Sequence, residues 1–177
     1  MADSNITKRA LATALKELME EEQFSKISVA DICSRCDMNR KSFYYHFKDK
    51  YDLVNWIFDI EFFKIIGQKE QKDSWEILEN LCTYFYENKN FYRNALKVQG
   101  QNSFEEHLVE LITPVLEIRI QELIGETEAN EFYMNFIMDA FLGSLKRWIL
   151  DKKEMPPEQF AELLKSCLDL IANASKK

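Results

Sequence analysis

Residues 28–53 read SVADICSRCDMNRKSFYYHFKDKYDL, and this stretch decides the fold that the sequence predicts. Directly after Ser28, apolar residues recur at spacings of three and four, which is the pattern of one helix face. Ser28 is a candidate N-cap, and Asp31 three residues later supplies the second half of a capping box. Residues 36–39 then interrupt the pattern, because Asp and Asn favour turns and caps over helix interiors. The stretch therefore begins with a short helix and a turn.

A second short helix follows the turn, and Asn39 is its candidate N-cap. Phe43 and Phe47 supply its buried face, whereas most of the other positions carry hydrogen-bonding groups suited to base edges and phosphates. Two short helices, a turn of a few residues and a basic second helix form a helix-turn-helix. We therefore predict that this segment binds DNA.

The same stretch resembles the N-terminal DNA-binding domain of TetR-type bacterial transcription regulators. The resemblance rests mainly on residues 42–50, where an aromatic block containing one His is followed by Lys-Asp-Lys, and it covers roughly the first third of the chain. Two turn positions depart from the family, since Cys36 and Asp37 replace the usual Ala and Gly. Asp tolerates a left-handed backbone better than most residues, so we expect the turn to be preserved.

The side chains of the second helix and its flanks are expected to divide between two kinds of DNA contact. The residues predicted to approach base edges are Arg40, Lys41, Ser42 and Tyr44. The residues predicted to grip phosphates are Ser28, Tyr45, His46, Lys48 and Lys50. Asn39, as the cap of the helix, completes this candidate DNA-binding set.

The composition of the whole chain predicts an all-α protein of about nine helices. Only 4 Gly and 3 Pro occur in 177 residues, and β-branched residues are sparse beside Leu, Glu, Lys, Phe and Ala. A three-helix DNA-binding head is expected over residues 1–50, and a helical effector-binding and dimerisation domain over 51–177. A helix from Lys50 to Ile66 connects the two, and the polar segment 67–73 resembles a linker. Pro114 is expected to kink or split a helix near residues 104–124.

The charge distribution favours DNA binding even though the formal net charge is −7. Residues 1–50 carry nine Lys and Arg against eight Asp and Glu, a net of +1, and the remainder carries 14 against 22, a net of −8. The acidic surface is therefore expected to lie away from the head. No apolar run approaches the roughly twenty residues of a membrane span, and no signal-peptide pattern is present. We expect a cytoplasmic protein without membrane association.

No feature of the sequence indicates an enzyme, a cofactor or a metal site. Cys33 and Cys36 have the C-x-x-C spacing, but a zinc site needs two more ligands and no second pair exists. A redox motif is expected where a strand meets a helix, so we interpret both as small buried side chains. The sequence contains no Gly-rich phosphate loop, nucleophile motif or paired-acid pattern.

The last two predicted helices carry a surplus of apolar surface. Apolar groups cover most of the helix circumference between residues 132 and 142, and the final helix adds an apolar stripe. Two such helices can pack against their symmetry copies as a four-helix bundle, which is also what the TetR resemblance implies. The alternative is that they complete a monomer core. The candidate interface residues are Tyr133, Ile137, Phe141, Trp148, Leu164 and Leu168.

Aromatic residues are numerous between the head and the last pair of helices, where TetR-like proteins enclose an effector pocket. The candidate pocket residues are Trp56, Phe63, Trp75, Tyr84, Phe91 and Phe104. Since no cluster of Lys or Arg accompanies these aromatics, a small apolar or aromatic effector is expected. The alternative is a filled core, with regulation by a partner protein on the acidic surface.

Together these features predict a homodimeric transcription regulator that binds a palindromic operator on double-stranded DNA. Residues 55–58, Trp75 and residues 87–92 further resemble a TetR subgroup that includes regulators of dihydroxyacetone kinase operons. A repressor and an activator are both compatible with this prediction. The alternative is a helical interaction protein that does not bind DNA, although it has no reason to keep basic residues such as Arg40 and Lys48 around an exposed helix.

Overall fold

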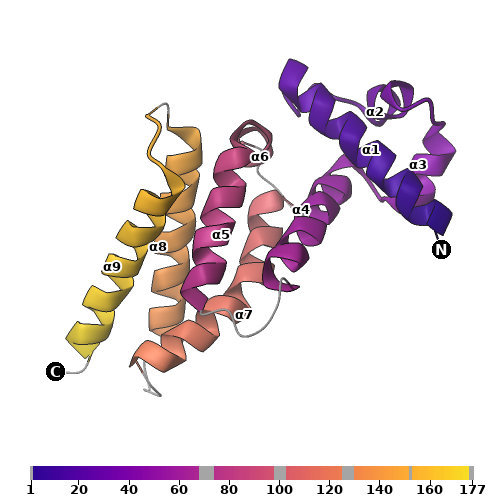
Figure 1. Ribbon diagram of the computed structural model, residues 1–177. Helices are drawn as coiled ribbons and strands as arrows, with labels where there is room; N and C mark the ends of the chain where they lie inside the picture. The colour runs from indigo at the N-terminus through magenta and orange to yellow at the C-terminus, as the bar shows by residue number, and fades with distance from the viewer. Residues whose placement is uncertain (1, 68–73, 98–102, 125–129, 152, 176–177) are drawn as a thin grey trace. The chain divides into compact units, whose positions relative to one another are not determined.

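The computed structural model describes residues 2–67, 74–97, 103–124, 130–151 and 153–175, and this part of the chain contains helices and no strands (Figure 1). The nine helices are α1 (Ala2–Glu21), α2 (Val29–Arg35), α3 (Arg40–His46), α4 (Lys50–Gly67), α5 (Ser74–Glu87), α6 (Lys89–Ala95), α7 (Phe104–Ile124), α8 (Asn130–Leu150) and α9 (Pro157–Ser175). The prediction of an all-α fold with about nine helices is confirmed. None of the helices in these ranges is long and apolar enough to cross a membrane.

The chain divides into two compact units. The first contains residues 1–64 and 90–107, and the second contains residues 65–89 and 108–177. The unit that holds the helix-turn-helix thus extends beyond the head expected over residues 1–50. Of the segment predicted to be a linker, residues 68–73 lie outside the described residues.

The core of the first unit forms where α1, α2, α3 and α4 meet. Leu11 and Leu15 of α1, Ile32 of α2, Phe43 of α3 and Leu53 of α4 are all fully buried. Because these side chains come from four helices, burying them fixes the helix-turn-helix against its supports. A second cluster of buried side chains lies in the same unit.

That second cluster is aromatic and joins α4 to the segment around α6 and the start of α7. The ring of Phe58 lies 5.2 Å from that of Phe104 in an edge-to-face arrangement, and the ring of Tyr92 lies 4.9 Å from that of Phe104. Asn94 Nδ2 also donates to the carbonyl of Met19, at 3.1 Å. These contacts explain why residues 90–107 belong to the same unit as the head.

The second unit contains α5, α8, α9 and most of α7. Trp148 of α8 stacks on Phe160 of α9 with 4.3 Å between ring centroids, and its indole N–H donates to the carbonyl of Met155 at 3.0 Å. This contact fixes the turn between α8 and α9, which lie side by side in Figure 1. Pro114 lies inside α7 without dividing it, and the helix changes direction along its length (Figure 1).

Candidate nucleic-acid interface

The first helix of the helix-turn-helix, α2, begins with the predicted capping box. The amide of Asp31 donates to Ser28 Oγ at 3.2 Å, and the amide of Ser28 donates to Asp31 Oδ2 at 2.8 Å. The Ser28 hydroxyl donates to the same oxygen at 2.6 Å. These bonds, that of the hydroxyl above all, lower the pKa of the Asp31 carboxyl. The Ser28 hydroxyl, a predicted phosphate ligand, is therefore already engaged at the cap.

A tight turn then connects α2 to α3 through a left-handed residue. Asp37 has φ of 53°, and the amide of Met38 donates to the carbonyl of Cys33 at 2.8 Å across the turn. The thiol of Cys36 donates to the carbonyl of Ile32 at 3.3 Å. Asp therefore occupies the conformation that Gly usually takes, as the sequence predicted. Both cysteines of the C-x-x-C spacing carry free thiols.

One side of α3 is anchored in the core, which leaves the other side to solvent. Asn39 caps the helix, since its Oδ1 accepts from the amide of Ser42 at 2.8 Å and from the Ser42 hydroxyl at 3.2 Å. Phe43 is completely buried and Phe47 nearly so. Tyr45, which has a different orientation on the helix, is 83% exposed. The helix is thus held rigidly with its polar side accessible.

The exposed side of α3 presents unpaired cationic groups. Arg40 and Lys41 are exposed, and neither side chain makes a hydrogen bond or ion pair within the described residues. Tyr44, one helical turn after Arg40, is 52% exposed. Since Arg, Lys and Tyr all carry hydrogen-bond donors, this surface suits acceptors on base edges and phosphates.

The segment that follows α3 is fixed by the N-terminus of α4. The amide of Lys48 donates to Asp52 Oδ2 at 2.8 Å, and Asp49 Oδ1 accepts from the amides of Tyr51 and Asp52, both at 2.9 Å. The side chain of Lys48 remains exposed. His46 is half-buried, with its ring centroid 4.9 Å from that of Tyr45 in an edge-to-face arrangement.

Lys50 has an environment that the sequence did not predict. Its ammonium donates to the carbonyls of Phe24 and Ile27, both at 2.7 Å, and lies 4.6 Å from the centroid of the Phe24 ring. Burial lowers the pKa of this ammonium. Its donors therefore bind the loop between α1 and α2, although the sequence had predicted a phosphate contact for this residue.

A second cation of the head also has a structural role. Arg35 forms a bidentate salt bridge with Glu21, in which Nη1 lies 2.8 Å from Oε1 and Nη2 lies 2.7 Å from Oε2. This pair joins the end of α2 to the end of α1. It was not predicted, because the two residues are 14 positions apart and only the fold brings them together.

The predicted dimer residues lie in the second unit, where three of the six are buried and three are half-buried within a single chain. Ile137, Phe141 and Trp148 are each less than a tenth exposed, and Tyr133 is half-buried. Ile137, Phe141, Leu164 and Leu168 line an apolar groove of about 100 Å³ together with residues of α5 and α7. The large apolar side chains that remain exposed on α8 and α9, among the described residues, are Phe132, Phe136, Leu150, Leu163 and Leu170.

The six predicted effector-pocket residues do not lie in one unit. Trp56, Phe63, Phe91 and Phe104 belong to the first unit, and Trp75 and Tyr84 belong to the second. Phe104, Phe91 and Trp75 are buried in their own units, whereas Phe63 is 60% exposed. Trp56 lines a cleft of about 230 Å³ between α1 and α4. The described side chains contain no group of three or more His, Cys, Asp and Glu residues placed to hold a metal ion.

Two family models match the chain. The model described as bacterial regulatory proteins, tetR family, matches residues 11–57, and a model described as a transcriptional regulator C-terminal region matches residues 73–170. The first match contains the whole helix-turn-helix, and the second spans more than half of the chain.

Curated relatives agree with this assignment. The HTH-type dhaKLM operon transcriptional activator DhaS of Lactococcus lactis is 34% identical over 99 residues, which are 55% of this chain and 53% of DhaS. The chain thus matches only about half the length of that relative. The transposon Tn10 TetC protein of Escherichia coli is 22% identical over 148 residues, covering 77% of this chain and 75% of TetC.

Solved structures share the fold across nearly the whole chain. A dihydroxyacetone kinase operon activator DhaS has a TM-score of 0.70 and 23% identity, with 97% of both chains covered. A TetR transcriptional regulator from Streptococcus agalactiae has a TM-score of 0.74 and 21% identity, with 94% of this chain and 96% of that chain covered. With its capped helix-turn-helix and both family models matched, the chain belongs to the TetR family of bacterial transcription regulators.

Proposed function

We propose that this regulator binds a palindromic operator as a homodimer, reads it with α3, and is switched through its C-terminal helices. The observation that carries the proposal is the asymmetry of α3. Phe43 and Phe47 anchor one side, and Arg40, Lys41 and Tyr44 on the other are exposed. Placing an anchored helix with free donors in the major groove is the usual way that a helix-turn-helix reads sequence.

Within this surface we assign two roles. Arg40, Lys41, Ser42 and Tyr44 approach base edges, while Tyr45, His46 and Lys48 contact flanking phosphates. Ser28 contributes through its cap at the N-terminus of α2, where free amides favour an anion. Lys50 supports the site indirectly, because its ammonium is bound to the loop before α2.

Dimerisation through α8 and α9 is the second part of the proposal. Phe132, Phe136, Leu163 and Leu170 are each at least half exposed in the single chain. Burying such side chains against a second copy removes apolar surface from water, which stabilises association. Two copies also bring two reading heads to one operator, and its two-fold symmetry then mirrors that of the protein.

The direction of regulation is part of the proposal as well. The curated relative that matches over 99 residues is described as the transcriptional activator of the dhaKLM operon. This description supports transcriptional activation by the present protein as an alternative to repression, which is common in regulators of this architecture. An effector or a partner protein at the C-terminal helices would set the balance between the DNA-bound and free forms.

The roles assigned to α3 and Lys48 can be separated on one selected operator. Lys48→Ala should weaken binding to specific and non-specific DNA alike and reduce the slope of log affinity against log salt by about one. Arg40→Ala should instead relax the preference at one base pair in each half-site and cost about 1–3 kcal/mol there. Unchanged affinity and salt slope in Lys48→Ala would contradict the phosphate-contacting role assigned to Lys48.

A further inference from the structure

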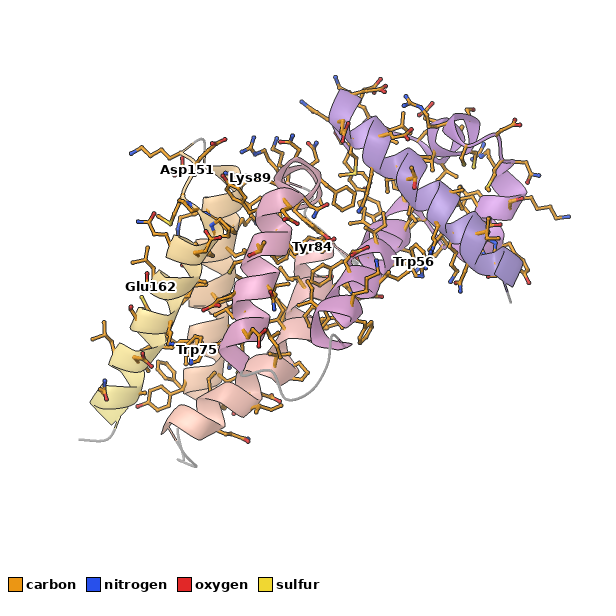
Figure 2. The ribbon with its side chains drawn as sticks, viewed as in Figure 1. Trp56, Trp75, Tyr84, Lys89, Asp151 and Glu162 are labelled. Carbon is orange, nitrogen blue, oxygen red and sulfur yellow. The ribbon has the colours of Figure 1, made fainter. Side chains whose placement is uncertain are left out.

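A cleft of about 230 Å³ lies between α1 and α4 in the first unit, beside Trp56 in Figure 2. Arg9 and Lys16 of α1 line it from positions seven residues apart, which lie on one face of the helix. Trp56, Ile60 and Lys64 of α4 line it at spacings of four. The cleft is therefore formed by two facing helix stripes, one basic and one mixed aromatic and basic.

The positive charges of this cleft outnumber its negative charges. Lys64 Nζ lies 2.8 Å from Glu61 Oε1, so those two groups neutralise each other. Arg9 forms no hydrogen bond or ion pair with any described residue, and Lys16 has only the ring of Phe91, at 5.8 Å from its ammonium. Neither Arg9 nor Lys16 therefore forms an ion pair within the described residues.

Lys16 differs from Arg9 in being half-buried, so its ammonium has lost part of its hydration. Loss of water on burial, together with repulsion from Lys64, lowers the pKa of its ammonium, and attraction to Glu61 only partly opposes this. A partly buried cation that makes no ion pair is costly for the fold. An anion placed between Arg9 and Lys16 would remove that cost.

We propose that the α1–α4 cleft binds a small organic anion, a carboxylate or phosphate joined to an apolar group. Arg9 and Lys16 hold the anionic end, and Trp56 and Ile60 contact the apolar part. A volume of about 230 Å³ corresponds to roughly eight water molecules at about 30 Å³ each. The ligand is therefore small, with roughly ten non-hydrogen atoms.

Only one end of this cleft lies near the helix-turn-helix. Lys8 lies 5.5 Å from the centroids of both the Phe47 and the Trp56 rings, so the end of the cleft at Trp56 adjoins the residue that follows α3. Lys64 lies 14 residues beyond Lys50 on α4, about 21 Å further along the helix at about 1.5 Å per residue. The stripe of cleft residues thus leads away from the exposed side chains of α3, which favours a small ligand over the DNA backbone.

A ligand that bridges α1 and α4 also fixes the position of α4 against the head. This part of the inference rests on the proposed operator binding. If the DNA-bound and free forms differ in the angle between α1 and α4, an anion in the cleft stabilises whichever form closes on it better. The site would then act as an effector site formed within the first unit, by α1 and α4.

Titration calorimetry with phenyl phosphate, benzoate, inorganic phosphate and the neutral benzyl alcohol tests the binding. Phenyl phosphate or benzoate should bind the full chain more tightly than inorganic phosphate, and benzyl alcohol should not bind. Arg9→Gln and Lys16→Met should each weaken binding by roughly tenfold, whereas Lys26→Met, an exposed lysine between α1 and α2, should not. Arg9 is exposed, so Arg9→Gln keeps the test decisive even if Lys16→Met disturbs folding.

Equal binding of the neutral compound, no binding of either aromatic anion at millimolar concentration, or unchanged affinity in Arg9→Gln would overturn the site. A lower salt slope for operator DNA in Lys16→Met would also overturn it, by assigning the cleft to the DNA backbone. Calorimetry needs no DNA, so failure to find any operator affects only the proposed function. A change in operator affinity on adding phenyl phosphate, absent in Arg9→Gln, would establish the coupling.

Discussion

Lys50→Met should destabilise the fold, whereas the same replacement at Lys48 should leave stability almost unchanged. The ammonium of Lys50 donates two hydrogen bonds of 2.7 Å, to the carbonyls of Phe24 and Ile27. The side chain of Lys48 is exposed and makes no hydrogen bond or ion pair within the described residues. Because Met retains most of the aliphatic stem, the comparison isolates the effect of the ammonium.

The expected magnitude for Lys50 follows from its contacts. A hydrogen bond from a charged donor contributes about 1.5–3 kcal/mol, and we take the lower end because water can replace the ammonium at a part-buried carbonyl. The ammonium over the Phe24 ring adds about 0.5 kcal/mol. A positive charge at the first residue of α4 opposes the helix dipole by about the same amount. The last two contributions cancel, so the predicted loss for the two hydrogen bonds is about 3 kcal/mol.

Urea unfolding followed by circular dichroism measures this difference directly. Lys50→Met should lower the unfolding free energy by about 3 kcal/mol. Lys48→Met should lower it by less than about 0.5 kcal/mol, the usual range for surface changes. The reasoning would be refuted if Lys50→Met were as stable as the wild type, or if the two variants lost equal stability. On operator DNA, Lys48→Met alone should lower the salt slope while the fold stays intact.

Three further predictions follow from the turn, the dimer surface and the cap. Asp37→Gly should keep the unfolding free energy within about 1 kcal/mol of the wild type, because Gly adopts φ of 53° without strain. Asp37→Val should lose about 1–2 kcal/mol in urea unfolding, and equal losses in the two variants would contradict the role of the positive φ at this turn. Phe136→Glu, at a position 52% exposed in one chain, should give a folded monomer of 21.0 kDa in sedimentation. The control Lys153→Glu, between α8 and α9, should remain dimeric, and a monomeric native protein would contradict the proposed dimer. Because Ser28 lowers the pKa of Asp31, that carboxylate stabilises the fold above its ordinary pKa and ceases to do so as pH falls through the lowered value. In thermal melts the stability difference between wild type and Asp31→Asn should therefore narrow below about pH 4. A difference that stays constant with pH would contradict this link between the pKa and stability.

The sequence predicted local structure well because the signals were local. Ser28 and Asn39 are cap residues within three positions of the amides they bind, and both caps form as predicted. The turn tolerates Asp37 for a reason internal to that residue, namely the ease with which Asp adopts a positive φ. Caps, turns and apolar spacing depend on nearest neighbours along the chain, so one sequence suffices to detect them.

The tertiary roles of the charged residues were less predictable. Lys50 was grouped with the phosphate ligands because it follows the aromatic block, yet its partners are 23 and 26 residues away. The cleft lined by Arg9, Lys16 and Lys64 was missed for the same reason, since its basic residues come from two helices that are distant in sequence. A pattern along the chain identifies which face of a helix is basic. Only the packing of the helices shows which residues lie against that face.

The dimer candidates illustrate a similar limit of periodicity. Ile137 and Phe141 lie on the apolar side of α8, but that side packs within the chain and leaves each residue less than a tenth exposed. The apolar groups that remain free for a second copy, among them Phe132 and Phe136, lie elsewhere on the same helix. An all-round apolar helix indicates two buried faces, and the structure is needed to tell the inner face from the outer one.

Selection from a random duplex DNA library with the full-length protein tests the central claim most directly. We predict an enriched inverted repeat in which each half-site contains a base pair whose preference relaxes in Arg40→Ala, with binding that weakens steeply as salt rises. Lys26→Met, which changes an equally exposed cation outside α3, should enrich the same sequence. Recovery of no common sequence by the folded wild type, or an identical motif selected by Arg40→Ala, would contradict the proposal that α3 reads an operator.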